Sequence, residues 1–138
     1  MKGIIYKIVD NTNDDVYYGA TYQKLCARKA GHRRDYNRYK NGKSFYTTAY
    51  DIFDRGNFNF EEIYSIENDD LDTLKADLKV LERKYIENNT CVNKVIPGRT
   101  KTEYSRYYYH QNKDKINKQR KERRLHKKII SNNNIDNV

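Results

Sequence analysis

The first twenty residues alternate between apolar and polar stretches. Residues 3–9 and residues 16–21 are rich in β-branched and aromatic side chains, and residues 10–15 between them consist mainly of Asn and Asp. Two apolar runs around such a polar segment predict a β-hairpin, because β-branched and aromatic residues favour strands whereas Asn and Asp favour turns.

The expected pairing of this hairpin brings two phenols together. If Val9 pairs with Asp14, Tyr6 lies opposite Tyr17 and the two side chains share one face of the sheet. Such a pair either packs only, as aromatic cross-strand pairs commonly do, or belongs to a functional site.

The pattern downstream predicts three helices and one more strand. Thr21 is the expected N-cap of a helix that ends near Asn41, where Asn41-Gly42 forms a stop signal. One stripe of this helix carries Leu25, Arg28, His32, Tyr36 and Tyr39. Apolar spacing predicts a short helix over residues 44–55, a strand over 58–66, and a helix over 71–89 whose buried stripe is Leu74, Leu78, Leu81 and Tyr85. The expected fold is α+β, with a three-stranded antiparallel β-sheet flanked by helices, over residues 1–97.

Charge divides the chain into a nearly neutral body and a basic extension. Residues 1–98 contain 16 Lys and Arg against 15 Asp and Glu, whereas residues 99–128 contain 12 against 3. Residues 98–128 are mostly good helix formers with few apolar anchors, so we expect a basic helical C-terminal extension, followed by a disordered tail over 129–138. Such concentrated positive charge is typical of proteins that bind a phosphate backbone, although an acidic partner or a solvated surface is the alternative.

Several classes of protein are disfavoured by composition. The sequence contains neither a membrane span nor a signal-peptide pattern, so we expect a soluble intracellular protein of the cytoplasm or nucleus. Cys26 and Cys91 lack the spacing of a disulfide framework or a zinc site.

The hairpin resembles the signature of the GIY-YIG nuclease superfamily. Ile5-Tyr6 matches the last two letters of the first triplet, and Tyr17-Tyr18-Gly19 matches the second triplet with Tyr in place of Ile. Ile4 stands where the first triplet has Gly. Both tyrosines are present, and the resemblance is to the small single-domain endonucleases of the superfamily, of the homing type or the viral and phage type.

The resemblance continues in order through the body. Arg28 and His32 match the family's Arg-x-x-x-His motif, Glu82 its metal-binding glutamate, and Asn93 the asparagine near the end of the domain. The resemblance implies that Arg28 contacts the scissile phosphate and that Glu82 binds Mg²⁺ or Mn²⁺. Such cations often use only one or two protein carboxylates. Asn93 is either a contact of the site or an ordinary turn residue.

These residues imply a metal-dependent endonuclease that hydrolyses DNA. Tyr6 or Tyr17 would take the proton from the attacking water, and the sequence does not decide between them. The expected partners are DNA and a divalent metal, with no membrane, no other small-molecule cofactor, and a monomer or weak homodimer. The expected DNA-binding residues are Lys24, Lys29, Arg33, Arg34, Arg38, Arg99, Lys101, Arg106, Lys118, Arg120, Arg123 and Arg124. The alternative functions are a non-catalytic nucleic-acid-binding module that retains the fold and, with less support, a tyrosine-rich RNA-binding protein.

Overall fold

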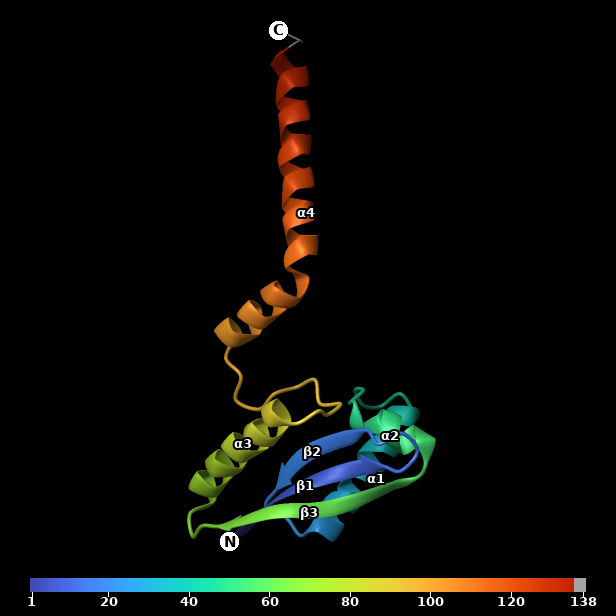
Figure 1. Cartoon of the computed structure of the whole chain (residues 1–138). Helices are drawn as coiled ribbons and strands as arrows, with labels where there is room; N and C mark the ends of the chain where they lie inside the picture. Colours follow the sequence, from blue (N-terminus) through green and yellow to red (C-terminus); the bar gives the residue numbers. More distant parts are fainter. Residues whose placement is uncertain (136–138) are drawn as a thin grey trace. The chain divides into compact units, whose positions relative to one another are not determined.

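The computed structural model describes residues 1–135 and divides the chain into two compact units, residues 1–98 and a C-terminal unit that begins at Arg99 (Figure 1). The first unit contains β1 (Lys2–Asp10), β2 (Val16–Thr21), α1 (Leu25–Lys40), α2 (Ala49–Arg55), β3 (Phe58–Glu67) and α3 (Leu71–Asn88). The second contains α4 (Lys101–Ile135). Among these described residues, no helix has the length and apolar character needed to cross a membrane.

The three strands form one antiparallel sheet in the order β2-β1-β3, which confirms the predicted α+β fold with a three-stranded sheet (Figure 1). The predicted register of the hairpin is wrong by two residues, because Tyr6 pairs with Gly19, and Tyr17 pairs with Ile8. The turn is longer than expected: Asp10 accepts hydrogen bonds from Thr12, and its own N–H bonds to the carbonyl of Asp15. A shift of two residues preserves the face, so Tyr6 and Tyr17 still lie on the same side of the sheet.

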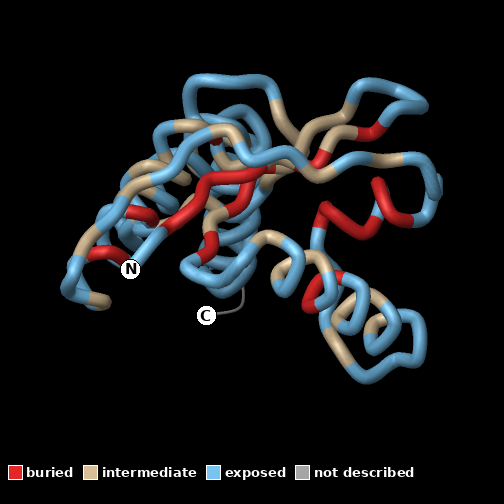
Figure 2. The backbone as a smooth tube through the Cα atoms, turned by 90° about the horizontal axis from the view of Figure 1, so that it is seen from below, coloured by how far each residue is buried: buried red, intermediate tan, exposed pale blue. Residues whose placement is uncertain are grey.

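Helices cover both faces of the sheet. On one face, Ile4, Tyr6 and Ile8 of the central strand pack against the buried side chains of α2 and against the apolar stripe of α1. On the other face, Ile5 packs against Leu74 and Leu78 of α3. Figure 2 marks these buried stretches in red. The central strand is therefore buried on both faces, and this holds its side chains in fixed positions.

A β-bulge changes which side chains of β3 are buried. The pairing with β1 shifts between Ile5 and Tyr6, where Ile5 pairs with Tyr64 and Tyr6 pairs with Glu62. The simple alternation of sides expected for a strand over residues 58–66 fails at this point, because Ile63 packs in the core beside α3 and Tyr64 is 48% exposed.

Two of the predicted helix starts are also wrong. Thr21 ends β2, and its hydroxyl accepts the N–H of Gln23, so α1 begins only at Leu25 and has no side-chain cap. The short helix begins at Ala49, not residue 44, and Phe45 before it is 93% exposed. The long helix over Leu71–Asn88 agrees with the prediction and is capped by Asp70, which accepts the N–H of Thr73.

The second unit is a single helix with a capping box. Thr100 and Glu103 each accept the other's backbone N–H, and this satisfies two otherwise unpaired donors at the start of α4. No residue of α4 is buried among those described. The helix continues through residues 129–135, for which we expected disorder, because propagation adds one hydrogen bond for each residue fixed. Residues 136–138 of the expected tail lie outside the described residues.

Candidate active site

Three of the residues singled out in the sequence form one hydrogen-bonded cluster. The hydroxyl of Tyr6, from the central strand, lies 2.7 Å from Nε2 of His32 and accepts a hydrogen bond of 3.0 Å from Nε of Arg28. Arg28 and His32 are one turn apart on α1, so both point to the same face of the sheet. The two terminal nitrogens of Arg28 make no hydrogen bond within the part of the chain that the structure describes, and they are free for a ligand.

Gly19 allows the phenol of Tyr6 to reach this position. Gly19 is the residue that pairs with Tyr6 across the hairpin, and a Cβ added there would lie 2.4 Å from both Cζ and Oη of Tyr6. Carbon atoms this close overlap, so the ring can cross strand β2 only above a glycine. Gly19 is the last residue of the second triplet in the sequence, and the close approach of the Tyr6 ring is the physical reason for a glycine at this position.

We expect Gly19→Ala to lower the free energy of unfolding by about 1–3 kcal/mol, the usual cost of inserting a methyl group into a packed core. Gly31→Ala is the matched control, because a Cβ there would meet only a nitrogen of Arg34 at 3.9 Å, and alanine favours a helix interior. Urea unfolding of both variants measures the difference. Equal stabilities for wild type and Gly19→Ala would show that the Tyr6 ring moves aside at no cost.

The environment of the cluster fixes its protonation. Burial, and next the positive charge of Arg28, lowers the pKa of His32 to about 4, so the imidazole is neutral near pH 7. Burial also raises the pKa of Tyr6, and Arg28 opposes this rise through its charge and its hydrogen bond. Since Arg28 donates to the Tyr6 oxygen, the hydroxyl proton is available for donation to the neutral His32 ring.

Tyr17 is differently placed from Tyr6. Its ring lies edge-on to the His32 ring at 6.2 Å, and its hydroxyl has no hydrogen bond among the described residues. Burial, and next the neighbouring Tyr6, raises the pKa of Tyr17, which keeps this phenol protonated at neutral pH. Together with Asn93, Tyr17 lines a cavity of about 390 Å³ that is separate from the one described next.

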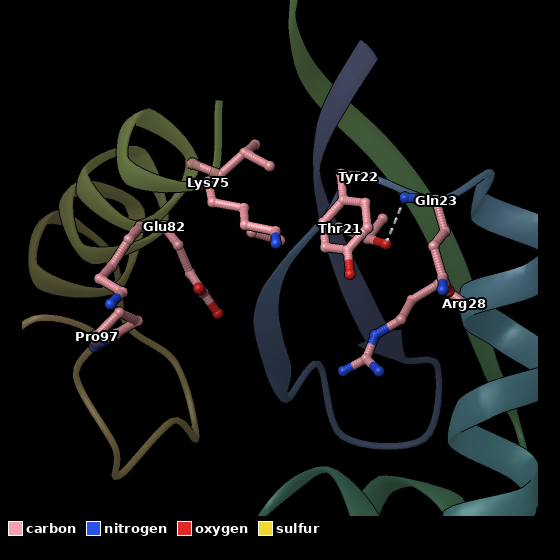
Figure 3. A pocket seen from close by; sticks show the side chains of 10 residues that line it. Thr21, Tyr22, Gln23, Arg28, Lys75, Glu82 and Pro97 are labelled. Atoms are coloured by element: carbon pink, nitrogen blue, oxygen red, sulfur yellow. Dashed lines mark hydrogen bonds between the residues drawn. The ribbon is translucent and has the colours of Figure 1, made fainter. Parts of the chain in front are cut away.

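Arg28 and Glu82 line one open cavity beside the edge strand β2. The cavity has a volume of about 360 Å³ and lies between α1, which carries Arg28, and α3, which carries Glu82. Figure 3 shows the Glu82 carboxylate extending from α3 toward the side occupied by the Arg28 guanidinium. The fold therefore brings together residues that are 54 positions apart in sequence (82 − 28).

Glu82 suits a hard divalent cation. Burial raises the pKa of its carboxyl, although the positive charge of Arg28 works against this rise. No hydrogen bond or ion pair satisfies this carboxylate among the described residues, and no group of three or more His, Cys, Asp or Glu side chains there could hold a metal ion. A partly desolvated, unpaired carboxylate is a donor that Mg²⁺ accepts while keeping several of its waters.

Asn93 holds the edge strand in place. Its side-chain oxygen accepts the N–H of Tyr18 and its amide nitrogen donates to the Tyr18 carbonyl, both at 2.8 Å. The N–H of Val92 bonds to the carbonyl of Val16 beside it. Because the polar atoms of Asn93 are used in this way, the residue positions β2, and with it Tyr17 and Gly19, from outside the sheet.

Sequence reasoning missed part of the cavity wall. Tyr22, Lys75 and Lys79 line the same cavity as Arg28 and Glu82. The signal lay in the spacing of α3, where positions 75, 79 and 82 fall on one helical face. Tyr22 carried no such signal, because it lies in the short connection between β2 and α1.

The basic residues of α1 and of its N-cap are available for contact with an anion. Lys24, Arg33, Arg34 and Arg38 are exposed, whereas Lys29 is half-buried with its ammonium 5.4 Å from the centre of the Phe60 ring. In the second unit, the guanidinium of Arg99 lies 4.7 Å from the centre of the Tyr107 ring. None of the basic residues predicted to bind DNA forms an ion pair among the residues that the structure describes.

Comparison with known proteins gives one match. No family model and no curated protein matches the chain. Among solved structures, the chain is similar to a mutant of the catalytic domain of the intron endonuclease I-TevI, with a TM-score of 0.45 and 18% identity over 64% of this chain and 84% of that chain. A likeness at this level assigns no activity, so function has to be inferred from the side chains of this chain.

Proposed function

We propose that the chain is a metal-dependent endonuclease of the GIY-YIG type that hydrolyses phosphodiester bonds of DNA. The observation that carries the proposal is the hydroxyl of Tyr6, which lies between Nε of Arg28 and Nε2 of His32. Arg28 also lines a cavity whose opposite wall carries the unpaired carboxylate of Glu82. A phenol with a proton acceptor, next to a cation that faces an open cavity, is suited to activating water beside a phosphate.

Arg28 binds the scissile phosphate in this proposal. Its Nε is held by Tyr6, which fixes the plane of the guanidinium and leaves both terminal nitrogens for phosphate oxygens. Negative charge develops on those oxygens as water attacks phosphorus. A fixed guanidinium stabilises that charge without having to reorient during the reaction.

Tyr6 is the proposed general base. Its oxygen takes a proton from the attacking water while its own proton passes to Nε2 of the neutral His32, so that no free phenolate has to form. Tyr6 is fully buried in the free protein, where Arg28 and His32 cover its hydroxyl. We therefore infer that binding of DNA opens the site enough to admit water to Tyr6, while the hydrogen bond from Nε of Arg28 to Tyr6 is kept.

Tyr17 and Asn93 have supporting roles in the proposal. The raised pKa of Tyr17 makes it a poor base at neutral pH, and its free hydroxyl is suited to donate a hydrogen bond to the phosphate or the water. Asn93 acts through the backbone of β2 and does not contact the reacting atoms.

Glu82 is the proposed ligand of Mg²⁺ or Mn²⁺. When bound, the cation would supply Lewis-acid stabilisation of charge on the phosphate, in the same cavity as Arg28. The raised pKa and the lack of a hydrogen-bonded partner support this role, because binding of a cation would compensate the desolvated carboxylate.

The experiment that tests this function is nicking of a supercoiled plasmid by the full chain in Mg²⁺, with a chelator added to parallel samples. We expect nicked and then linear DNA only where the metal is free. Binding of DNA without metal-dependent nicking at any salt concentration would instead identify the chain as a non-catalytic binding module.

The basic extension is proposed to supply most of the affinity for DNA. Truncation after Gly98 removes nearly all of the net charge but keeps a compact unit with all six proposed site residues. If about five basic residues of the extension contact phosphates, the log-log dependence of duplex binding on salt should become shallower by roughly four to five units. The measurement is a salt titration of both proteins on one duplex. An unchanged salt slope would mean that the basic surface of α1 binds DNA without a contribution from the extension.

A further inference from the structure

The cavity that holds Arg28 and Glu82 has a second wall that the proposed reaction does not use. This wall consists of Tyr22, which follows β2, and of Lys75 and Lys79 on α3. Figure 3 shows the Lys75 side chain extending from α3 toward the Tyr22 ring, with the Arg28 guanidinium and the Glu82 carboxylate below them in the view. Because these residues line the same cavity as Arg28 and Glu82, a strand whose scissile phosphate is bound there would pass beside them.

The charge of this wall favours a second phosphate. Three cations, Arg28, Lys75 and Lys79, line the cavity against one acid, Glu82. Neither lysine forms an ion pair among the described residues, although α3 and its surroundings contain several acids. A divalent cation on Glu82 would increase the positive charge further. The cavity is therefore suited to more anionic charge than one phosphodiester provides.

Tyr22, the aromatic residue beside Lys75, adds a ring on which a base can stack. The Tyr22 ring is 50% exposed, and the ammonium of Lys75 lies 5.2 Å from its centre. An exposed aromatic ring whose neighbour is an unpaired cation matches a nucleotide, because bases stack on aromatic rings and the linking phosphate is anionic. A volume of about 360 Å³ lies within the range of ligand cavities, roughly 300–1,000 Å³.

We propose that Tyr22 and Lys75 form a binding subsite for the nucleotide next to the scissile phosphate, with its base stacked on Tyr22 and its phosphate bound by Lys75. This inference rests on the proposed function for the position of the scissile phosphate. A base can stack on Tyr22 only after it leaves its neighbour in the duplex. The subsite therefore favours DNA that is single-stranded, mismatched or nicked at this position over intact duplex.

The test measures binding by the full chain without metal, so that no cleavage occurs. The probes are fluorescein-labelled oligodeoxythymidylate, an abasic strand of the same length and an intact duplex, each titrated over a salt series. Tyr22→Ala is compared with Tyr64→Ala, since Tyr64 is 48% exposed but lines a different cavity. Lys75→Gln is compared with Lys84→Gln, another exposed lysine of α3 that lines that other cavity.

The two variants should have different signatures. Tyr22→Ala should weaken binding of oligodeoxythymidylate by about tenfold and change duplex binding less, while the salt slope stays unchanged. The variant protein should also bind the thymidylate strand and the abasic strand equally well. Lys75→Gln should make the salt slope on single-stranded DNA shallower by about 0.7, the value for one phosphate contact. Tyr64→Ala and Lys84→Gln should behave as wild type.

Each other result overturns the subsite. If Tyr22→Ala binds like Tyr64→Ala, or discriminates against the abasic strand as wild type does, no base stacks on Tyr22. If Lys75→Gln keeps the wild-type slope, Lys75 contacts no phosphate. Because these measurements need no cleavage, they remain valid if the wild-type protein fails to nick the plasmid. If the wild-type protein nicks the plasmid but Tyr22→Ala and Lys75→Gln bind DNA as wild type does, the subsite is ruled out and the proposed function is kept.

Discussion

Glu82→Gln is expected to abolish metal-dependent cleavage while the protein stays folded and binds DNA. Glutamine has nearly the same shape but no charge, so it loses the cation and little packing. Loss of several kcal/mol of charge stabilisation lowers the rate by on the order of 10³ or more. Plasmid nicking measured together with duplex binding in chelator separates these effects.

Glu87→Gln is the matched control for this variant. Glu87 lies on the same helix, accepts a hydrogen bond from Arg83, and lines none of the cavities described above. It should cleave at the wild-type rate. If Glu82→Gln lost DNA binding in chelator along with activity, the carboxylate would have a structural role.

Tyr6→Phe should lower the cleavage rate by about 10²- to 10⁴-fold, the range for a positioned general base. The substitution keeps the ring that packs over Gly19 and removes only the oxygen that joins Arg28 to His32. It should also cost about 1–3 kcal/mol in unfolding free energy, because two polar groups lose their buried partner. Single-turnover cleavage in saturating protein reports the rate independently of binding.

Two further tyrosines make this result interpretable. Tyr18→Phe is the control, since Tyr18 packs against Tyr85 on the other face of the sheet. Tyr17→Phe should have a smaller effect than Tyr6→Phe, because the hydroxyl of Tyr17 has no hydrogen-bond partner among the described residues that could take its proton. The reverse order, with Tyr17→Phe slow and Tyr6→Phe close to wild type, would make Tyr17 the base.

The elements of the fold could be predicted because their signals are local. The alternation of the hairpin and the apolar stripe of α3 each lie within twenty residues. The register was wrong because it depends on the turn, where Asp10 forms side-chain hydrogen bonds to Thr12 that no apolar pattern encodes. The bulge in β3 was missed for a similar reason, since it reflects packing of Ile63 against another element.

The candidate site was predictable only where a motif marked it. Tyr6, Arg28 and His32 were named from the sequence, and the structure brings their side chains into contact. Asn93 was named, but its two hydrogen bonds to Tyr18 join residues 75 positions apart, which spacing cannot show. Tyr22 and Lys75 were missed because they become neighbours only when α3 packs beside β2.

The attachment of residues 92 and 93 to β2 has a consequence for the order in which the domain is completed. Strand β2 is an edge strand, and among the described residues its outward backbone groups at Val16 and Tyr18 are satisfied by this late segment of the first unit. During synthesis the hairpin emerges long before Asn93, so a nascent or prematurely ended chain carries an open strand edge able to pair with other chains. The same segment that orders the strand bearing Tyr17 and Gly19 thus also covers part of an edge with which other chains could pair.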